Sequence, residues 1–212
     1  MPPLVPSLSP LPTVFVVDDD ASFRNAIERL LRAGGYAVQT FASAAEFLRC
    51  ARSDAPGCIL LDVHMPGPSG LHLQSALARS ENPLPIVFVT GKGDIPTSVQ
   101  AMRAGAEDFL TKPVNKTVLF PAIKRALARD ALEREQRTRR CELRARFDTL
   151  TPREREVLAH VLSGQLNKQI AMDVKASERT VKAHRANIMA KLHVQSVAEL
   201  AHLAHEAGFG DR

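Results

Sequence analysis

Four apolar segments in the first half of the chain each end in a side chain that can take part in phosphoryl or metal chemistry. One ends in the carboxylate pair Asp18 and Asp19, and another ends in the single carboxylate of Asp62. Two more end in the hydroxyl of Thr90 and the ammonium of Lys112. Because open α/β sheets build their sites at the carboxyl ends of the strands, we expect these five side chains to share one pocket.

The chemistry expected of this pocket is phosphoryl acceptance. Neighbouring carboxylates repel one another, so the pocket should bind a cation, and oxygen ligands of this kind suit Mg²⁺. Asp62 is the candidate nucleophile, because a carboxylate can accept a phosphoryl group as an aspartyl phosphate. Thr90 and Lys112 would then contact the phosphoryl oxygens. Each residue alone would be an ordinary loop, cap or surface residue. The agreement of four strand ends is what indicates a site.

The elements that position these residues follow from the hydrophobic pattern of residues 13–122. Short apolar segments alternate with amphipathic ones, which predicts βα units around a parallel sheet. Ser43 and Glu46 have the spacing of a capping box, and Gly34 with Gly35 ends the preceding helix. The expected strands are 14–18, 36–40, 58–62, 86–90 and 108–111, and the expected helices are 21–33, 44–51, 70–79, 96–104 and 115–130.

Composition limits the class of protein. The chain has 212 residues, 45% of them hydrophobic and 24% charged, as in soluble globular proteins of one or two domains. No apolar run approaches the roughly 20 residues that cross a bilayer, and the proline-rich residues 1–12 read as a disordered lead-in rather than a signal peptide. Cys50, Cys58 and Cys141 are odd in number and lack paired-ligand spacing, which indicates reduced thiols. We expect a cytoplasmic protein with no membrane partner.

A linker and a second domain follow. Residues 123–147 carry most of the excess behind the net charge of +5 and contain no glycine or proline. We expect an exposed basic helix there, which is either a short coiled coil in a dimer or a solvated spacer. Thr151, Pro152 and Glu154 then form a helix start signal. The four short helices expected in residues 148–212 indicate a small all-α domain with a helix-turn-helix.

The helix expected after Ser177 has one basic, narrow face. Val181, Ile188 and Leu192 fall at core spacing, and the basic and small residues lie largely opposite them. Such a face suits the major groove of DNA. We expect Lys182 to read a base edge and His184 to be packed or phosphate-facing. Phosphate contacts are expected from Lys168, Arg179, Thr180 and Arg185, and Ala183 and Ala186 would contact thymine methyls or merely leave room.

Residues 13–122 resemble the receiver domain of two-component response regulators over essentially their whole length. The motifs that carry the resemblance are Val17-Asp18-Asp19, Leu61-Asp62 followed by Met65-Pro66-Gly67, Thr90-Gly91 and Lys112-Pro113. The resemblance implies a flavodoxin-like fold, with a five-stranded parallel sheet in the order 2-1-3-4-5. It also implies that Asp62 receives phosphate from a histidine kinase.

The same resemblance assigns roles within the pocket. It implies that Asp19 and Asp62 bind Mg²⁺ through their side chains, that His64 contributes its backbone carbonyl, and that Asp18 holds the water shell of the metal. It implies a switch formed by Thr90 and Phe109, and a cis peptide between Lys112 and Pro113. Val114 stands where the family usually has phenylalanine, which affects local packing rather than chemistry.

Residues 148–206 closely resemble the LuxR-type helix-turn-helix, and the whole chain resembles a FixJ/NarL-class response regulator. The resemblance implies a phosphorylation-dependent transcriptional regulator that forms a homodimer through residues 96–113. The dimer would place two recognition helices on paired half-sites of double-stranded DNA. Activation, with RNA polymerase as a partner, is the expected outcome, and repression stays open. The residues on the pattern are Glu154, Leu158, Ile170, Ala171, Thr180, Val181, Lys182, His184, Ile188, Lys191 and Leu192.

Two other functions fit parts of the pattern. A Mg²⁺-dependent phosphatase would use Asp62 as its nucleophile. It would also need a general acid two residues further on, where this chain has His64, and no cap domain is available for a substrate. A module that binds only protein would not need the basic face at residues 179–185, and salt-dependent DNA binding would separate the two. We therefore expect a regulator and not an enzyme.

Overall fold

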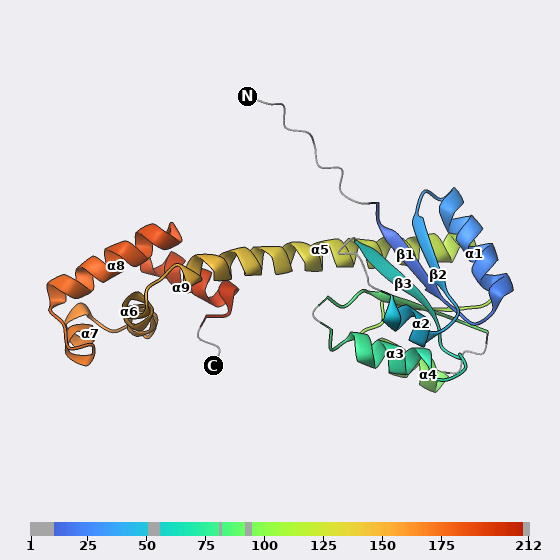
Figure 1. Cartoon of the computed structure of the whole chain (residues 1–212), viewed down its shortest axis with the longest axis horizontal. Coiled ribbons are helices and arrows are strands. Elements are labelled where there is room, and N and C mark those ends of the chain that lie inside the picture. Colours follow the sequence, from blue (N-terminus) through green and yellow to red (C-terminus); the bar gives the residue numbers. More distant parts are fainter. Residues whose placement is uncertain (1–10, 51–55, 81, 92–94, 210–212) are drawn as a thin grey trace, which may run out of the picture. The chain divides into compact units, whose positions relative to one another are not determined.

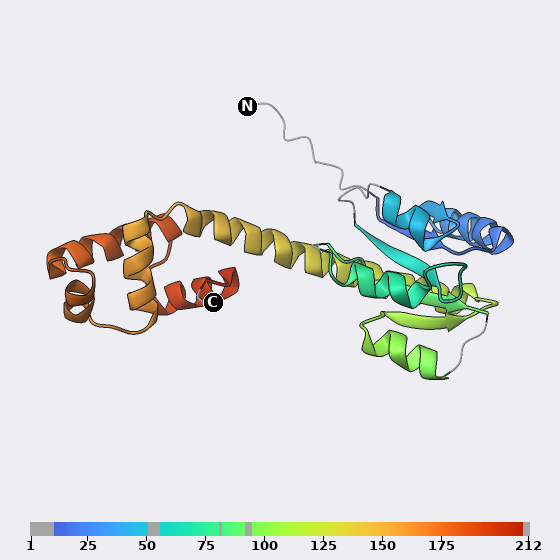
Figure 2. The same ribbon diagram turned by 60° about the horizontal axis from the view of Figure 1, so that its bottom comes forward.

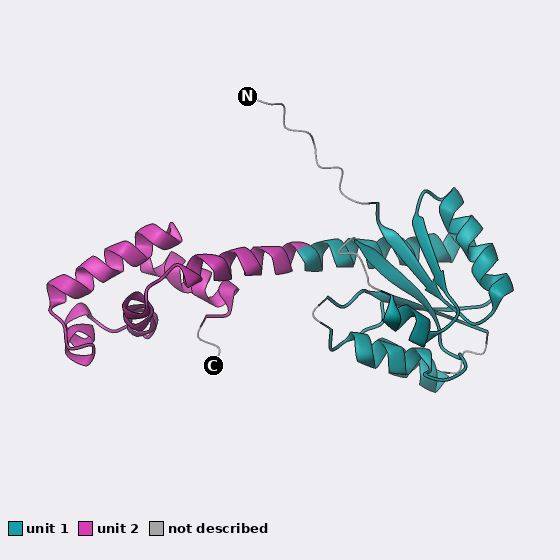
Figure 3. Cartoon of the chain, viewed as in Figure 1, with its two compact units in different colours: residues 1–134 teal, residues 135–212 magenta. Residues whose placement is uncertain are grey.

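The computed structural model describes residues 11–50, 56–80, 82–91 and 95–209, so residues 1–10 of the expected lead-in lie outside the described part. The chain divides into two compact units between Arg134 and Glu135 (Figure 3). The first unit is built on a parallel sheet, and the second is helical (Figure 1). Among the described residues, no helix is both long enough and apolar enough to cross a bilayer.

Five parallel strands form the sheet of the first unit. Their order is β2-β1-β3-β4-β5, so the flavodoxin-like fold and the order 2-1-3-4-5 are confirmed. The strands are β1 (Thr13–Val17), β2 (Ala37–Phe41), β3 (Gly57–Asp62), β4 (Ile86–Thr90) and β5 (Asp108–Thr111). The helices are α1 (Ala21–Ala33), α2 (Ala44–Arg49), α3 (Gly70–Leu77), α4 (Ile95–Arg103) and the beginning of α5 (Lys116–Asp148).

Alternation along the central strands produces two cores, one on each face of the sheet. The ribbon of the sheet and its helices is drawn from a second direction in Figure 2. Phe15 and Val17 of β1 point into the core that also contains residues of α2, α3 and α4. Val14 and Val16 point into the other core, which contains residues of α1 and α5. Burial on both faces explains why these strands read as continuous apolar runs in the sequence.

Helix α5 runs for 33 residues, so the helix expected at 115–130 continues without a break into the basic helix expected at 123–147. Ile123 and Ala126 are fully buried in a core of the first unit. Leu143 and Phe147 are buried in the core of the second unit. The segment 123–147, expected to be a linker, therefore supplies core residues to both units.

The second unit contains α6 (Pro152–Leu162), α7 (Asn167–Asp173), α8 (Glu178–Leu192) and α9 (Val197–Ala207), together with the end of α5. Thr151 and Glu154 form the expected capping box, because each side chain accepts a hydrogen bond from the other's backbone N–H. The buried Glu154 carboxylate also forms an ion pair with Lys191 of α8 at 2.7 Å. This contact joins α6 to α8, the helix that is expected to enter the DNA groove.

The capping signal at Ser43 differs in one detail from the expected box. The Ser43 hydroxyl accepts the Glu46 N–H, as expected. The Glu46 carboxylate, however, accepts the N–H of Ala42 rather than that of Ser43. The helix still begins at the expected residue, because the Ser43 hydroxyl satisfies one of the N–H groups that lack a helical partner at its start.

Candidate functional site

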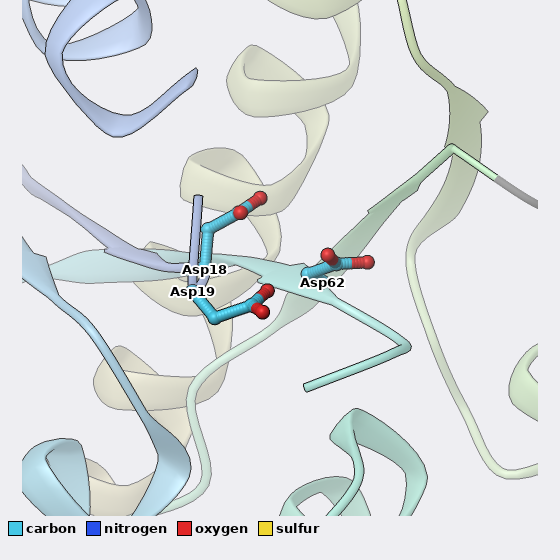
Figure 4. A group of neighbouring side chains, drawn as sticks. All are labelled: Asp18, Asp19 and Asp62. Atoms are coloured by element: carbon cyan, nitrogen blue, oxygen red, sulfur yellow. The ribbon is translucent and has the colours of Figure 1, made fainter. Parts of the chain in front are cut away.

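Three aspartates meet at the carboxyl ends of β1 and β3 (Figure 4). Asp18, Asp19 and Asp62 can each offer one carboxylate oxygen such that these oxygens all lie within 4.8 Å of one another. Asp18 and Asp62 are buried, and Asp19 is exposed. The register of the sheet produces this cluster, since Val17 pairs with Leu61 and the next residues emerge at the same edge. Asp20 has a separate role, because it caps α1 by accepting the N–H groups of Ser22 and Phe23.

Lys112 reaches the cluster from the end of β5. Its Nζ lies 2.6 Å from Asp18 Oδ2 and 3.1 Å from Asp62 Oδ2. The same ammonium lies 4.2 Å from the centre of the Phe23 ring, a cation–π contact that sequence reasoning missed. The Lys112–Pro113 peptide is cis, as the resemblance implied.

The electrostatics of the cluster favour a bound cation. Burial raises the pKa of Asp18, although hydrogen bonds with Lys112 and Asp20 oppose that rise. Burial would lower the pKa of Lys112, but its hydrogen bonds and charge interactions with Asp18 and Asp62 raise it overall. The ammonium of Lys112 pairs with two of the three carboxylates, and a divalent cation would relieve the remaining repulsion among them. The donor set consists of hard oxygen atoms and fits such a cation.

Thr90 lies fully buried at the end of β4, next to the strand that carries Asp62. A hydrogen bond of 3.2 Å joins its Oγ1 to Nδ1 of His64. The backbone N–H of His64 donates to Asp62 Oδ1 at 3.3 Å. Phe109, the expected switch aromatic, is half-buried on β5 with its ring centre 6.0 Å from that of Phe88. The structure therefore brings His64 to the pocket through its ring as well as its backbone.

The expected DNA contacts gather on α7 and α8 of the second unit. Val181, Ile188 and Leu192 are buried, which leaves the opposite side of α8 in solvent. Arg185 is half-buried, and its guanidinium donates to Asn167 Oδ1 at 2.8 Å. It therefore ties α8 to α7, a role that sequence reasoning missed. The exposed members of the expected set are Lys168, Arg179, Thr180, Lys182, Ala183 and Ala186.

Comparison with known families covers both units. Residues 14–124 match the family described as the response regulator receiver domain. Residues 148–204 match the family described as bacterial regulatory proteins of the luxR family. The two matches agree with the division of the chain into a sheet domain and a helical domain.

Relatives match over nearly the whole chain. Nodulation protein W of Bradyrhizobium diazoefficiens is 42% identical over 195 residues, which cover 92% of this chain and 86% of that protein. The transcriptional regulatory protein FixJ of Rhizobium meliloti is 40% identical, covering 93% of this chain and 97% of its own length. Among solved structures, the response regulator StyR has a TM-score of 0.77 at 47% identity, covering 92% of this chain and 99% of its own.

These similarities extend over both units of the chain. A phosphoryl-accepting receiver joined to a LuxR-type DNA-binding domain has a histidine kinase and DNA as its partners. The chain belongs to the two-component response regulators of the FixJ type and is a phosphorylation-dependent regulator of transcription.

Proposed function

We propose that Asp62 is the residue that receives the phosphoryl group from the histidine kinase. The observation that carries this assignment is the position of Asp62, buried at the end of the central strand β3 with Lys112 3.1 Å from its Oδ2. A carboxylate in this position can act as the nucleophile, and the ammonium of Lys112 lies where it could also contact the oxygens of the incoming phosphoryl group. Asp18 and Asp19 lie beside it, with one carboxylate oxygen of each of the three aspartates within 4.8 Å of the others.

We propose Mg²⁺ as the cation of this pocket, with Asp19, Asp62 and the carbonyl of His64 as its ligands and Asp18 holding its waters. When bound, Mg²⁺ would neutralise charge on the phosphoryl oxygens. Lys112 would exchange part of its pairing with Asp18 for the new phosphoryl oxygens. The Thr90 hydroxyl would turn to donate to another of them, and the ring of Phe109 would repack.

The response that we propose is dimerisation through residues 96–113, with α4 as the main contact. Ile95, Val99 and Met102 follow one another at spacings of four and three residues, so they lie along one side of the helix. They are 80%, 42% and 46% exposed, a large apolar exposure for one short helix. A second copy of this face would cover the stripe. Dimerisation would then bring two α8 helices to paired half-sites on DNA, where we propose RNA polymerase as the next partner and activation as the result.

We also propose that the chain is not a phosphatase. The position two residues after Asp62 is occupied by His64, whose ring is hydrogen-bonded to Thr90 rather than placed as a free general acid. The basic, exposed surface of α8 in the second unit supports a DNA-binding output over an enzymatic one.

The proposal is tested by labelling the full chain with acetyl phosphate or a kinase in the presence of Mg²⁺. Asp62→Asn should abolish acid-labile labelling and the accompanying shift from monomer to dimer in sedimentation. Asp20→Ser is the matched control, because it removes a neighbouring carboxylate but retains a residue that can cap α1. An Asp62→Asn protein that is labelled at the wild-type rate would refute the assignment. Equal sedimentation of labelled and unlabelled wild-type protein would refute the dimerisation.

A further inference from the structure

The side chain of His64 is the part of the pocket that the proposed chemistry leaves without a role. Metal binding would use only its backbone carbonyl. Its ring is exposed, yet Nδ1 lies 3.2 Å from Oγ1 of the fully buried Thr90. The exposed residue His64 is thus bonded to the buried hydroxyl on which the proposed switch depends.

Geometry makes this contact a competitor of the phosphoryl group. In the unphosphorylated chain, the Thr90 hydroxyl is held on the side of His64. With Nδ1 as the acceptor of this bond, the hydroxyl must leave Nδ1 to donate to a phosphoryl oxygen on Asp62, since one hydroxyl offers one proton. The energy of the His64–Thr90 bond is therefore subtracted from the energy that phosphorylation supplies to the switch.

We propose that the His64 side chain is a positioning residue that holds Thr90 in its unphosphorylated arrangement and so sets the threshold of the switch. This inference rests on the proposed function of Thr90 and Phe109. The N–H of His64 donates to Asp62 and its ring bonds Thr90, so one residue touches both the phosphate acceptor and the switch. A change at Asp62 can therefore weaken the His64–Thr90 hydrogen bond directly.

The expected effect follows from the net free energy of one part-buried hydrogen bond. Removing it should raise the ratio of switched to unswitched protein about two- to fivefold in the unphosphorylated chain. His64→Ala removes the ring and retains the backbone N–H and carbonyl. His64→Asn is the matched variant, because its side-chain amide places a polar atom near the position of Nδ1 and should keep the ratio close to that of the wild type.

The test measures the fraction of switched protein by the NMR positions of the Thr90 and Phe109 amides in the full chain. Unlabelled and fully labelled wild-type protein provide the two end points, and occupancy of Asp62 is measured separately by mass spectrometry. His64→Ala should move the unlabelled protein toward the labelled end point, and His64→Asn should restore it. In a Thr90→Val background, which lacks the hydroxyl, His64→Ala should have no further effect.

The outcomes distinguish the proposed role of the His64 ring from the proposed switch of Thr90 and Phe109. If His64→Ala has the same effect with and without the Thr90 hydroxyl, or no effect in either background, the positioning role of the His64 ring is refuted. The proposed switch of Thr90 and Phe109 is not affected by that result. If labelling Asp62 in wild-type protein changes the NMR position of neither amide, the proposed switch is wrong. The positioning role of His64, which rests on that switch, is then wrong as well.

Discussion

Substituting alanine for Gly70 should displace the phosphate acceptor although Gly70 itself carries no chemistry. Gly70 begins α3, and its N–H donates to the carbonyl of Val63 at 3.0 Å. A Cβ added at Gly70 would lie 2.2 Å from the backbone oxygen of Asp62 and 3.1 Å from the Phe88 ring. The nearest obstacle is backbone and not the end of a flexible side chain. The strand end that carries Asp62 must therefore move.

The size of the effect follows from this distance. Contact partners in a packed core must separate by roughly 1 Å to accept the added methyl, and such overpacking costs about 1–3 kcal/mol. A 1 Å displacement of a reacting group also costs about 100-fold in rate. We therefore expect Gly70→Ala to unfold several degrees earlier and to label Asp62 at a small fraction of the wild-type rate, as measured by thermal scans and by phosphate incorporation.

Gly91 provides the matched control for this experiment. It follows Thr90 at the same edge of the sheet, and an added Cβ there would meet nothing within 4 Å. Gly91→Ala should label at a rate within about twofold of the wild type, because substitutions without clashes usually change stability by less than 0.5 kcal/mol. Wild-type labelling by Gly70→Ala, with an unchanged unfolding temperature, would show that β3 and α3 yield without moving the acceptor and would refute the reasoning.

Two further predictions concern the second unit. The hydrogen bond from Lys191 and that from the Thr151 backbone lower the pKa of Glu154 below its usual 4.5, so its contribution to stability is complete above that pH and is lost as pH falls through the lower folded-state value. Glu154→Gln should lower the free energy of unfolding by about 1–2 kcal/mol at pH 7, after allowance for the partly exposed Lys191. It should also reduce the loss of that free energy on the acid side, as measured by urea unfolding at several pH values. An unchanged pH dependence would contradict the pairing of Glu154 with Lys191. On DNA, Lys182→Ala should cost about 1–3 kcal/mol of binding free energy on the specific site and relax the preference at one base pair per half-site. Arg179→Ala should instead lower the affinity for specific and scrambled duplexes alike and reduce the slope of log affinity against log salt by about one unit. Equal losses on both duplexes for Lys182→Ala would make it a phosphate contact.

The pocket could be predicted from the sequence because it depends on a rule of topology. Parallel strands deliver their carboxyl ends to one edge, so Asp18, Asp62, Thr90 and Lys112 needed only to be placed at strand ends. The apolar runs are long enough to fix those ends within one residue. The order of the strands came from the family resemblance, since alternation of strands and helices alone permits other parallel sheets.

The contacts between side chains could not be predicted in the same way. The bond between His64 and Thr90 joins residues that are 26 positions apart, and it depends on how a side chain turns after its strand has ended. The bond between Arg185 and Asn167 likewise depends on the crossing of two helices. Periodicity places Arg185 on the basic face of α8 and gives no information about a partner on α7. For this reason Arg179, which is exposed, is a cleaner probe of phosphate contact than Arg185.

The basic character of residues 123–147 shows why charge counts are weak evidence about partners. An excess of arginine there suggested a solvated spacer or coiled coil, yet several of these side chains have intramolecular partners. Arg144 donates to the carbonyl of Ala207 at 3.1 Å, and Arg139 pairs with Glu206 at 3.1 Å. These cations satisfy the end of α9, where unpaired carbonyls and the helix dipole favour positive charge. Part of the positive charge in α5 therefore stabilises contacts within the DNA-binding domain. Only the other exposed basic side chains are available to a nucleic acid.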